Sequence, residues 1–223
     1  VDATYVSGSS SKDLVFSYTI AGNLTDLGAI SLPANGLELN NGSIKDLAQN
    51  DANLAHAAVA ADTTYLVDTT AAKVSSTVLA YEGGIAAEDG KTYLNAGDKV
   101  SVTVTMDEAV VVDTTNGTPR IKLGIAGVAA GTEIYAVYDA VATAALHDDT
   151  KTKLVFSYTI AENLTDLGAI SLPANGLELN SGSIKDLAGT NANLAHAAVA
   201  AGTYSVDTTA SSAVVAADKI LAN

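Results

Sequence analysis

The sequence predicts an all-β fold in which an antiparallel β-sandwich is repeated in tandem. Three observations lead to this prediction. Short segments alternate apolar and polar side chains, as half-buried strands do. Gly, Asn and Pro separate these segments at intervals of about eight to twelve residues, which is typical of sandwiches. Finally, a stretch of 48 residues occurs twice, with 43 identical positions.

The clearest expected strand is Lys99–Met106, KVSVTVTM. It places Val100, Val102 and Val104 on one face and Ser and Thr on the other, so one face is expected to be buried. The further expected strands are 120–126, 132–140, 153–160, 168–172, 176–184 and 203–209. The Ala-rich run 193–201 has some helix propensity, but its place among strands favours a short crossing segment.

The repeat defines the expected domains. Residues 14–61 match residues 154–201 at an offset of 140 without gaps. Only 13 residues precede the first copy, whereas a long stretch, 71–149, precedes the second. We therefore expect residues 1–70 to be the C-terminal part of one repeat, residues 71–209 to be a complete repeat, and residues 210–223 to begin a further one.

The incomplete first repeat has two interpretations. The chain is a segment of a longer array, or a neighbouring chain supplies the missing strands, since an open sheet edge accepts an added strand. The second interpretation is the weaker one for the C-terminal tail, because the tail offers about one strand where about three or four are missing.

Composition excludes several classes of protein. The net charge of −14 disfavours nucleic acid and anionic membrane surfaces, which attract Lys and Arg, and it favours divalent cations as partners. Without Cys there are no disulfides, thiolate metal sites or cysteine nucleophiles.

No apolar run approaches the about 20 residues of a membrane span, so we expect no membrane insertion. If the protein is secreted, the signal peptide lies in a longer precursor or has been removed.

The sequence does not predict an enzyme. There is no GxSxG motif, and the acidic residues are scattered through expected loops rather than paired. His56, His147 and His196 have no second His close in sequence, which disfavours a zinc site.

Four segments in order resemble a known family. They are NAGDKVSVTVTMDEAVVVD, ATYVSGSSSKDLVFSYTI, GLELNNGSIKDLAQNDANL and the junction VDTTA. Together they resemble the bacterial Ig-like tandem repeats of large secreted adhesins, including RTX-type adhesins, and of biofilm proteins. The resemblance implies Ig-like β-sandwiches at the bacterial cell surface, with neighbouring repeats as partners and calcium as a stiffening ion. The chain departs from the family pattern at the junctions, which lack Pro, at MDE in place of FSE, and at Thr190 in place of Asn.

Calcium takes six to eight oxygen ligands, which acidic loops can supply. The candidate ligands form three groups. Asp68 and Asp207 lie at the junctions, where they would clamp successive repeats. Asp107, Glu108 and Asp113 lie near the end of a strand, and Asp46 and Asp186 occupy the repeated polar segment together with Asn50 and Asn191. The alternative is structural: Asp46 caps a turn with its carboxylate, and Asp107 and Glu108 are solvated surface charges.

These observations predict a structural extender segment of a surface adhesin, a calcium-stiffened rod of repeats. One alternative is a module that binds a glycan or a surface, for which the candidate aromatics are Tyr81, Tyr93, Tyr135 and Tyr138. The other is a surface-layer or filament subunit that assembles with copies of itself by strand exchange.

Overall fold

The computed structural model describes residues 1–126 and 132–211. The described chain is nearly all β, with antiparallel sheets and one short helix, so the all-β prediction is confirmed. It divides into two compact units, Val1–Thr70 and Ala71–Asn223, here called unit 1 and unit 2. Most of the predicted third-repeat tail, residues 212–223, lies outside the described residues. No described helix is long and apolar enough to cross a membrane.

Unit 1 consists of three strand pairs. Its strands are β1 (Thr4–Ser7), β2 (Val15–Ser17), β3 (Thr25–Asp26), β4 (Ile30–Leu32), β5 (Val59–Asp62) and β6 (Val67–Asp68). They pair antiparallel as β1–β2, β3–β6 and β4–β5. Among residues 1–70, all of which are described, the only buried apolar side chains are those of Ala29 and Val67. Unit 1 therefore has strands but almost no core.

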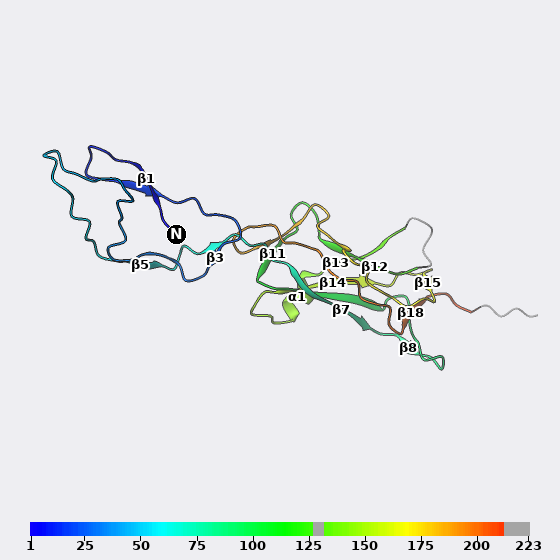
Figure 1. The fold of residues 1–223 in the computed structure, drawn as a ribbon. Coiled ribbons are helices and arrows are strands. Elements are labelled where there is room, and N and C mark those ends of the chain that lie inside the picture. Colours follow the sequence, from blue (N-terminus) through cyan, green and yellow to red (C-terminus); the bar gives the residue numbers. More distant parts are fainter. Residues whose placement is uncertain (127–131, 212–223) are drawn as a thin grey trace, which may run out of the picture. The chain divides into compact units, whose positions relative to one another are not determined.

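The described residues of unit 2 form twelve strands and one helix. Figure 1 labels several of these elements. The strands are β7 (Val74–Glu82), β8 (Ile85–Ala86), β9 (Thr92–Leu94), β10 (Lys99–Met106), β11 (Val110–Asp113), β12 (Arg120–Leu123), β13 (Ile134–Tyr138), β14 (Lys153–Thr159), β15 (Thr165–Asp166), β16 (Leu177–Glu178), β17 (Ser183–Asp186) and β18 (Tyr204–Asp207); the helix is α1 (Ala140–Ala145). Six strands form a sheet in the order β16-β12-β13-β14-β10-β7. Four form a second sheet, β15-β18-β9-β8, and β11 pairs with β17. Every pair of named strands is antiparallel except β18–β9.

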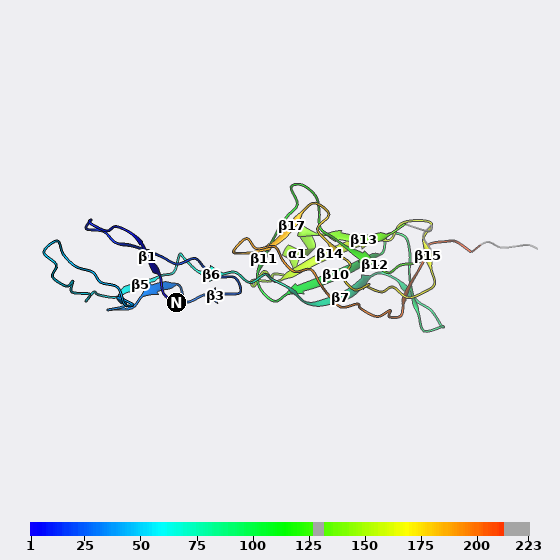
Figure 2. The same ribbon diagram turned by 45° about the horizontal axis from the view of Figure 1, so that its top comes forward.

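β10 lies between β7 and β14 in the six-stranded sheet (Figure 2). Its burial alternates as its sequence does: Val100, Val102 and Val104 are fully buried, while the Ser and Thr between them are half-buried. Val102 faces Phe156 of β14 across the ladder, and Phe156 is also fully buried. Burying side chains of this size stabilises the fold by about 1.5–3 kcal/mol each.

One core serves all the sheets of unit 2. Its buried cluster includes Val102 and Phe156 of the six-stranded sheet, Leu94 and Val206 of the four-stranded sheet, and Ile184 of β17. The strands of unit 2 depend on one another because each sheet buries its apolar face against the same cluster.

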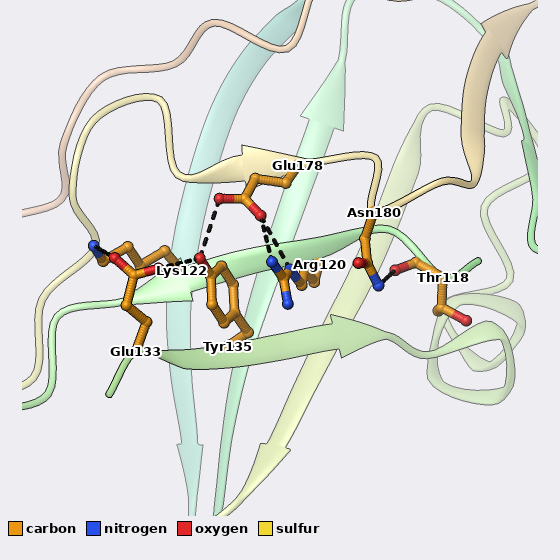
Figure 3. Close-up of polar contacts among 7 residues, drawn as sticks. All are labelled: Thr118, Arg120, Lys122, Glu133, Tyr135, Glu178 and Asn180. Carbon is orange, nitrogen blue, oxygen red and sulfur yellow. Dashed lines mark hydrogen bonds and ion pairs between the residues drawn. The ribbon is translucent and has the colours of Figure 1, made fainter. Parts of the chain in front are cut away.

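A polar cluster holds β16 at the edge of the six-stranded sheet (Figure 3). Arg120 donates from Nε and Nη2 to Oε2 of Glu178, at 3.0 and 2.9 Å, and its guanidinium lies 3.8 Å from the centre of the Tyr135 ring. The Tyr135 hydroxyl donates to Glu133 Oε2 at 2.5 Å, and Glu178 Oε1 lies 3.1 Å from the same hydroxyl. Lys122 pairs with Glu133. The hydrogen bond to Glu133, followed by desolvation and the bond to Glu178, raises the pKa of Tyr135 to about 12.

The individual strand predictions have mixed outcomes. The strand 99–106 is confirmed, and 153–160 is confirmed to within one residue. The predicted strand 176–184 is wrong as one element, because Asn180 and Ser181 adopt positive φ and separate β16 from β17. The segment 168–172 makes only isolated bridges.

The prediction for 132–140 is wrong at its C-terminal end. The strand ends at Tyr138, and α1 starts at Ala140. Asp139 is the N-cap, since its Oδ1 accepts from the N–H of Ala142 at 2.9 Å. The helix propensity of the Ala-rich segment 140–145 takes effect here because Asp139 caps its N-terminus. By contrast, the Ala-rich run 193–201 forms no helix, as expected.

Candidate metal centre

Three of the seven predicted ligands hold turns of one type. Asp68, Asp113 and Asp207 each precede a Thr by two residues. In each case Oδ1 accepts hydrogen bonds from both the backbone N–H and the hydroxyl of that Thr, at 2.6–3.1 Å. The Thr hydroxyl is the main cause that lowers the pKa of Asp113 and of Asp207. These contacts favour the structural interpretation, in which the aspartates cap turns.

The same turn occurs at Asp62 and Asp148, which the sequence did not single out. At Asp148 the Thr150 hydroxyl is again the main cause, and backbone N–H groups add to it, lowering the pKa to about 2. The Asp-x-Thr pattern is therefore a general turn element of this chain rather than a mark of metal ligands.

Asp107 fixes the first residues of unit 2. Its Oδ1 accepts from the N–H of Lys73 at 2.7 Å, its own N–H donates to the Lys73 carbonyl at 2.9 Å, and its Oδ2 lies 3.6 Å from Lys73 Nζ. The carboxylate is thus occupied by one neighbouring residue, which favours an anchoring role.

Asp46 lies in the polar turn of the first copy. Its Oδ1 accepts from the N–H groups of Ala48 and Asn50, at 2.8 and 2.9 Å, and its Oδ2 accepts from Asn50 Nδ2 at 2.9 Å. The Asn50 side chain is the main cause that lowers the pKa of Asp46. Both carboxylate oxygens therefore have donors within the turn.

Asp186 occupies the same position in the second copy, with a different result. Its Oδ1 accepts from the N–H of Thr190 at 2.8 Å. Thr190 replaces Asn50, so no amide reaches the other oxygen. Among the described residues Oδ2 of Asp186 is buried with no hydrogen-bond partner, and the residue is only 2% exposed. An unpaired buried carboxylate oxygen is costly and rare in native proteins.

Glu108 lies next to this oxygen-rich position. A carboxylate oxygen of Glu108 and one of Asp186 are within 4.8 Å of each other. The ladder explains the approach, because Asp186 at the end of β17 pairs with Val110, two residues after Glu108. Glu108 is half-buried. Within unit 2 the structure thus brings together two of the predicted ligands, and we call them the acidic pair.

The acidic pair has the chemistry of a hard-cation site. Asp186 is buried and Glu108 is half-buried, and a divalent cation between them would give Asp186 Oδ2 a partner. Calcium and magnesium prefer oxygen ligands, whereas zinc prefers Cys and His.

The chain has no Cys. His196 uses its ring within the turn, where Nε2 accepts from the N–H of Gly176 at 2.9 Å and Nδ1 lies 2.8 Å from the Ala197 carbonyl.

The sequence contains a signal for the difference between Asp46 and Asp186. The exchange of Asn50 for Thr190 is one of five differences between the copies, and it frees Asp186 Oδ2 while Asp46 Oδ2 stays bonded. Both residues were predicted as equivalent ligands. Their structural environments are not equivalent.

No family model, curated protein or solved structure matches the chain.

Proposed function

We propose that this chain is a structural extender segment of a bacterial cell-surface adhesin, built from Ig-like β-sandwich repeats and stiffened by calcium. The acidic pair is the observation that carries the proposal, because a buried unpartnered carboxylate oxygen beside a second carboxylate is suited to a cation. The near-identical repeat supports an array, and the common core of unit 2 supports a domain that bears load as one body.

The position of the acidic pair supports stiffening. Glu108 follows Asp107, which holds Lys73, and the Ala72 carbonyl accepts from the N–H of Asn193 at 2.7 Å. An ion on Glu108 and Asp186 would tie the start of β11 to the end of β17. The first residues of unit 2 are attached to these same segments, so their motion would be restricted. The junction aspartates Asp68 and Asp207 stay predictions as ligands.

The ligand-binding alternative receives less support from its aromatic residues. The Tyr81 ring stacks on that of Tyr204, with centroids 3.9 Å apart and planes at 12°. Tyr138 packs edge-on against Phe156. Tyr135 belongs to the polar cluster at the sheet edge. These rings take part in packing within the chain rather than forming an open aromatic platform.

A thermal melt tests the calcium site. With about 10 mM calcium and a Kd of about 10⁻⁴ M, the range of extracellular modules, the Tm of unit 2 is expected to rise by about 5–10 °C relative to excess chelator. Asp186→Asn should remove this shift, because it removes the unpartnered carboxylate oxygen. The matched control is Asp46→Asn, which changes the equivalent residue of the other copy and should leave the shift intact.

Two results would count against the proposal. One is an unchanged calcium shift in Asp186→Asn. The other is an equal shift with magnesium, since the stiffened rod requires a site that selects calcium. Glu108→Gln gives a second, independent variant in case Asp186→Asn alters the fold.

A further inference from the structure

The turn before β16 is joined to the Ala-rich crossing segment 193–201 by hydrogen bonds between the pair Asn175–Gly176 and His196. The Gly176 N–H donates to His196 Nε2 at 2.9 Å. The His196 N–H donates to Asn175 Oδ1 at 3.1 Å, and the Asn175 N–H donates to the His196 carbonyl at 3.1 Å. An Asn-Gly pair is thus held against a buried histidine, which is only 8% exposed.

The contacts of the His196 ring define its protonation state. Nδ1 lies 2.8 Å from the Ala197 carbonyl oxygen, which can only accept, so Nδ1 carries the ring hydrogen. Nε2 receives the Gly176 N–H, so it carries a lone pair. A histidine whose basic nitrogen is oriented by a hydrogen bond on the other nitrogen has the arrangement of a general base. The proton within its reach is that of the Gly176 amide.

An Asn-Gly pair has a specific reaction open to it. The backbone nitrogen that follows an Asn can attack the Asn Cγ, because the two atoms are tethered in one chain and ring closure gives a succinimide. The attacking residue must be unhindered, and Gly176 has no side chain. The reaction is slow in most contexts, because an amide nitrogen is a poor nucleophile until its proton is removed. A base on the Gly176 N–H addresses this barrier.

The hydrogen bond to Asn175 Oδ1 acts on the other reacting group. Attack on Cγ places negative charge on Oδ1, and the His196 N–H that already points at this oxygen stabilises the charge, as oxyanion-hole donors do. Gly176 is buried, and its carbonyl accepts from the Lys122 N–H at 2.9 Å, which fixes the attacking residue. Asn175 is exposed, so water reaches its side chain.

We propose that Asn175–Gly176 is a self-modification site at which His196 catalyses the deamidation of Asn175. His196 Nε2 takes the proton of the Gly176 amide, and the Gly176 nitrogen forms a bond to Asn175 Cγ. His196 then gives this proton to Asn175 Nδ2, the Cγ–Nδ2 bond breaks, and ammonia leaves. Water opens the succinimide at either carbonyl, which leaves an aspartate or an isoaspartate at position 175. Nothing is oxidised or reduced, and the co-reactant is water.

The reaction changes the turn permanently. Either product replaces a neutral amide by a carboxylate, and isoaspartate also places the side-chain methylene in the backbone directly before β16. β16 pairs with β12 at the edge of the six-stranded sheet, so the modification acts on this edge. The inference goes beyond the extender role and does not depend on calcium or on the acidic pair.

The test incubates the intact chain at neutral pH in water labelled with heavy oxygen, followed by trypsin digestion and mass spectrometry. Trypsin releases residues 154–185 as one peptide, in which Asn175 is the sole Asn followed by Gly. We expect Asn175 to be converted with uptake of one solvent oxygen and with both isoaspartate and aspartate as products, which electron-transfer fragmentation distinguishes.

Asn116–Gly117 is the internal reference, released by trypsin within residues 100–120. Asn116 is exposed, and among the described residues no histidine ring nitrogen accepts from the Gly117 N–H. Conversion of Asn175 should therefore be faster than that of Asn116, which has no base of its own.

His196→Gln separates the base from the hydrogen-bond acceptor. The Gln Oε1 can accept the Gly176 N–H but cannot take up its proton, so conversion of Asn175 should fall by at least about a hundredfold, the lower end of a general-base contribution. Conversion of Asn116 should be unchanged. His147→Gln is the matched control, because it changes another histidine of unit 2 and should leave Asn175 conversion intact.

Unfolding the unmodified chain in urea gives a second measurement in case His196→Gln alters the fold. Conversion of Asn175 should then slow to that of Asn116, because the hydrogen bonds to His196 are lost. Conversion of Asn175 that is equally fast in His196→Gln and in the unmodified chain, or no faster than that of Asn116 in the folded chain, would overturn the proposal. Aspartate as the sole product would also overturn it, because it would indicate direct hydrolysis without a succinimide.

Discussion

A single residue decides whether a carboxylate in the repeated turn is satisfied. Asn50 donates to Asp46 Oδ2, and the shorter Thr190 does not reach Asp186 Oδ2. The two turns also differ at Gln49/Gly189 and Asp51/Asn191, but Asp46 and Asp186 each accept from the N–H group four residues later. One side-chain amide therefore separates a closed turn from a candidate cation site.

Exchanging Asn50 and Thr190 between the two turns should exchange the hydrogen bonding of the Oδ2 atoms of Asp46 and Asp186. Thr190→Asn supplies a donor to Asp186 Oδ2, so unit 2 should gain about 1–3 kcal/mol in the free energy of unfolding without calcium, as for a hydrogen bond to a charged group. Its calcium-dependent rise in Tm should shrink. Chemical denaturation with and without chelator measures both effects.

The control for this exchange is Asn50→Thr, which opens the turn of unit 1 and should leave the calcium response of unit 2 unchanged. A full calcium shift in Thr190→Asn would show that Asp186 Oδ2 is not a ligand.

Tyr135 gives a residue-level test of the polar cluster. Its folded pKa, about 12, lies above the unfolded value of 10.0, so the cluster contributes stability below pH 10 that is lost as the pH rises through 12. Glu133→Gln removes the main cause and should bring the pKa of Tyr135 back toward 10.0. An NMR titration of labelled tyrosines measures this. A pKa of Tyr135 near 10.0 in the unmodified protein would contradict the geometry.

Among the elements, the sequence predicts the bounds of a strand well when the strand buries one face and pairs with a neighbouring strand along each edge. β10 has its predicted bounds because its alternation is uninterrupted and it lies between two strands. The predicted bounds of a strand are wrong where a helix cap or a residue with positive φ ends the strand. Asp139 caps a helix inside an expected strand, and Asn180 and Ser181 break another with positive φ.

The turn between β16 and β17 depends on a close backbone approach. A Cβ at Gly182 would lie 2.4 Å from the Gly117 carbonyl oxygen and 2.9 Å from that of Asp113. Gly182→Ala should therefore destabilise unit 2 by about 1–3 kcal/mol, as overpacking does. Urea denaturation followed by tyrosine fluorescence measures the loss.

Gly42→Ala is the matched control, because the equivalent Cβ would meet only the Leu39 carbonyl oxygen, at 3.0 Å. It should change the free energy of unfolding by less than about 0.5 kcal/mol, as typical surface substitutions do. Equal effects of the two substitutions would show that the Gly117 contact is not structural.

At the scale of the whole molecule, the same sequence occurs in one unit with a core and in another almost without one. Unit 2 buries a cluster that joins three sheets, whereas in unit 1 only Ala29 and Val67 are buried apolar residues. Hydrogen bonds of the β1–β2 pair cannot compensate for the missing burial, because hydrophobic burial is the dominant favourable term in folding.

The two units should therefore open with different free energies. Amides of residues 14–17 are expected to exchange at least about a thousandfold faster than those of 154–157, since local opening ranges from about zero to the full free energy of unfolding. Hydrogen exchange of the chain alone measures this. Equal protection at low chain concentration would mean that unit 1 has a core of its own.

The sequence by itself determined the all-β class, the central strand β10, the repeat and the set of acidic residues from which a cation site can be drawn. These features follow from side-chain periodicity and composition, which are local properties of the chain. Only the tertiary structure decided that Asp186 and Glu108 lie together, that Asp46 is satisfied, and that Phe16 is exposed where Phe156 is buried. The physical reason is that burial and hydrogen-bond satisfaction depend on segments distant in the sequence, here β10, β11 and β12. Residues of identical local sequence therefore acquire different environments.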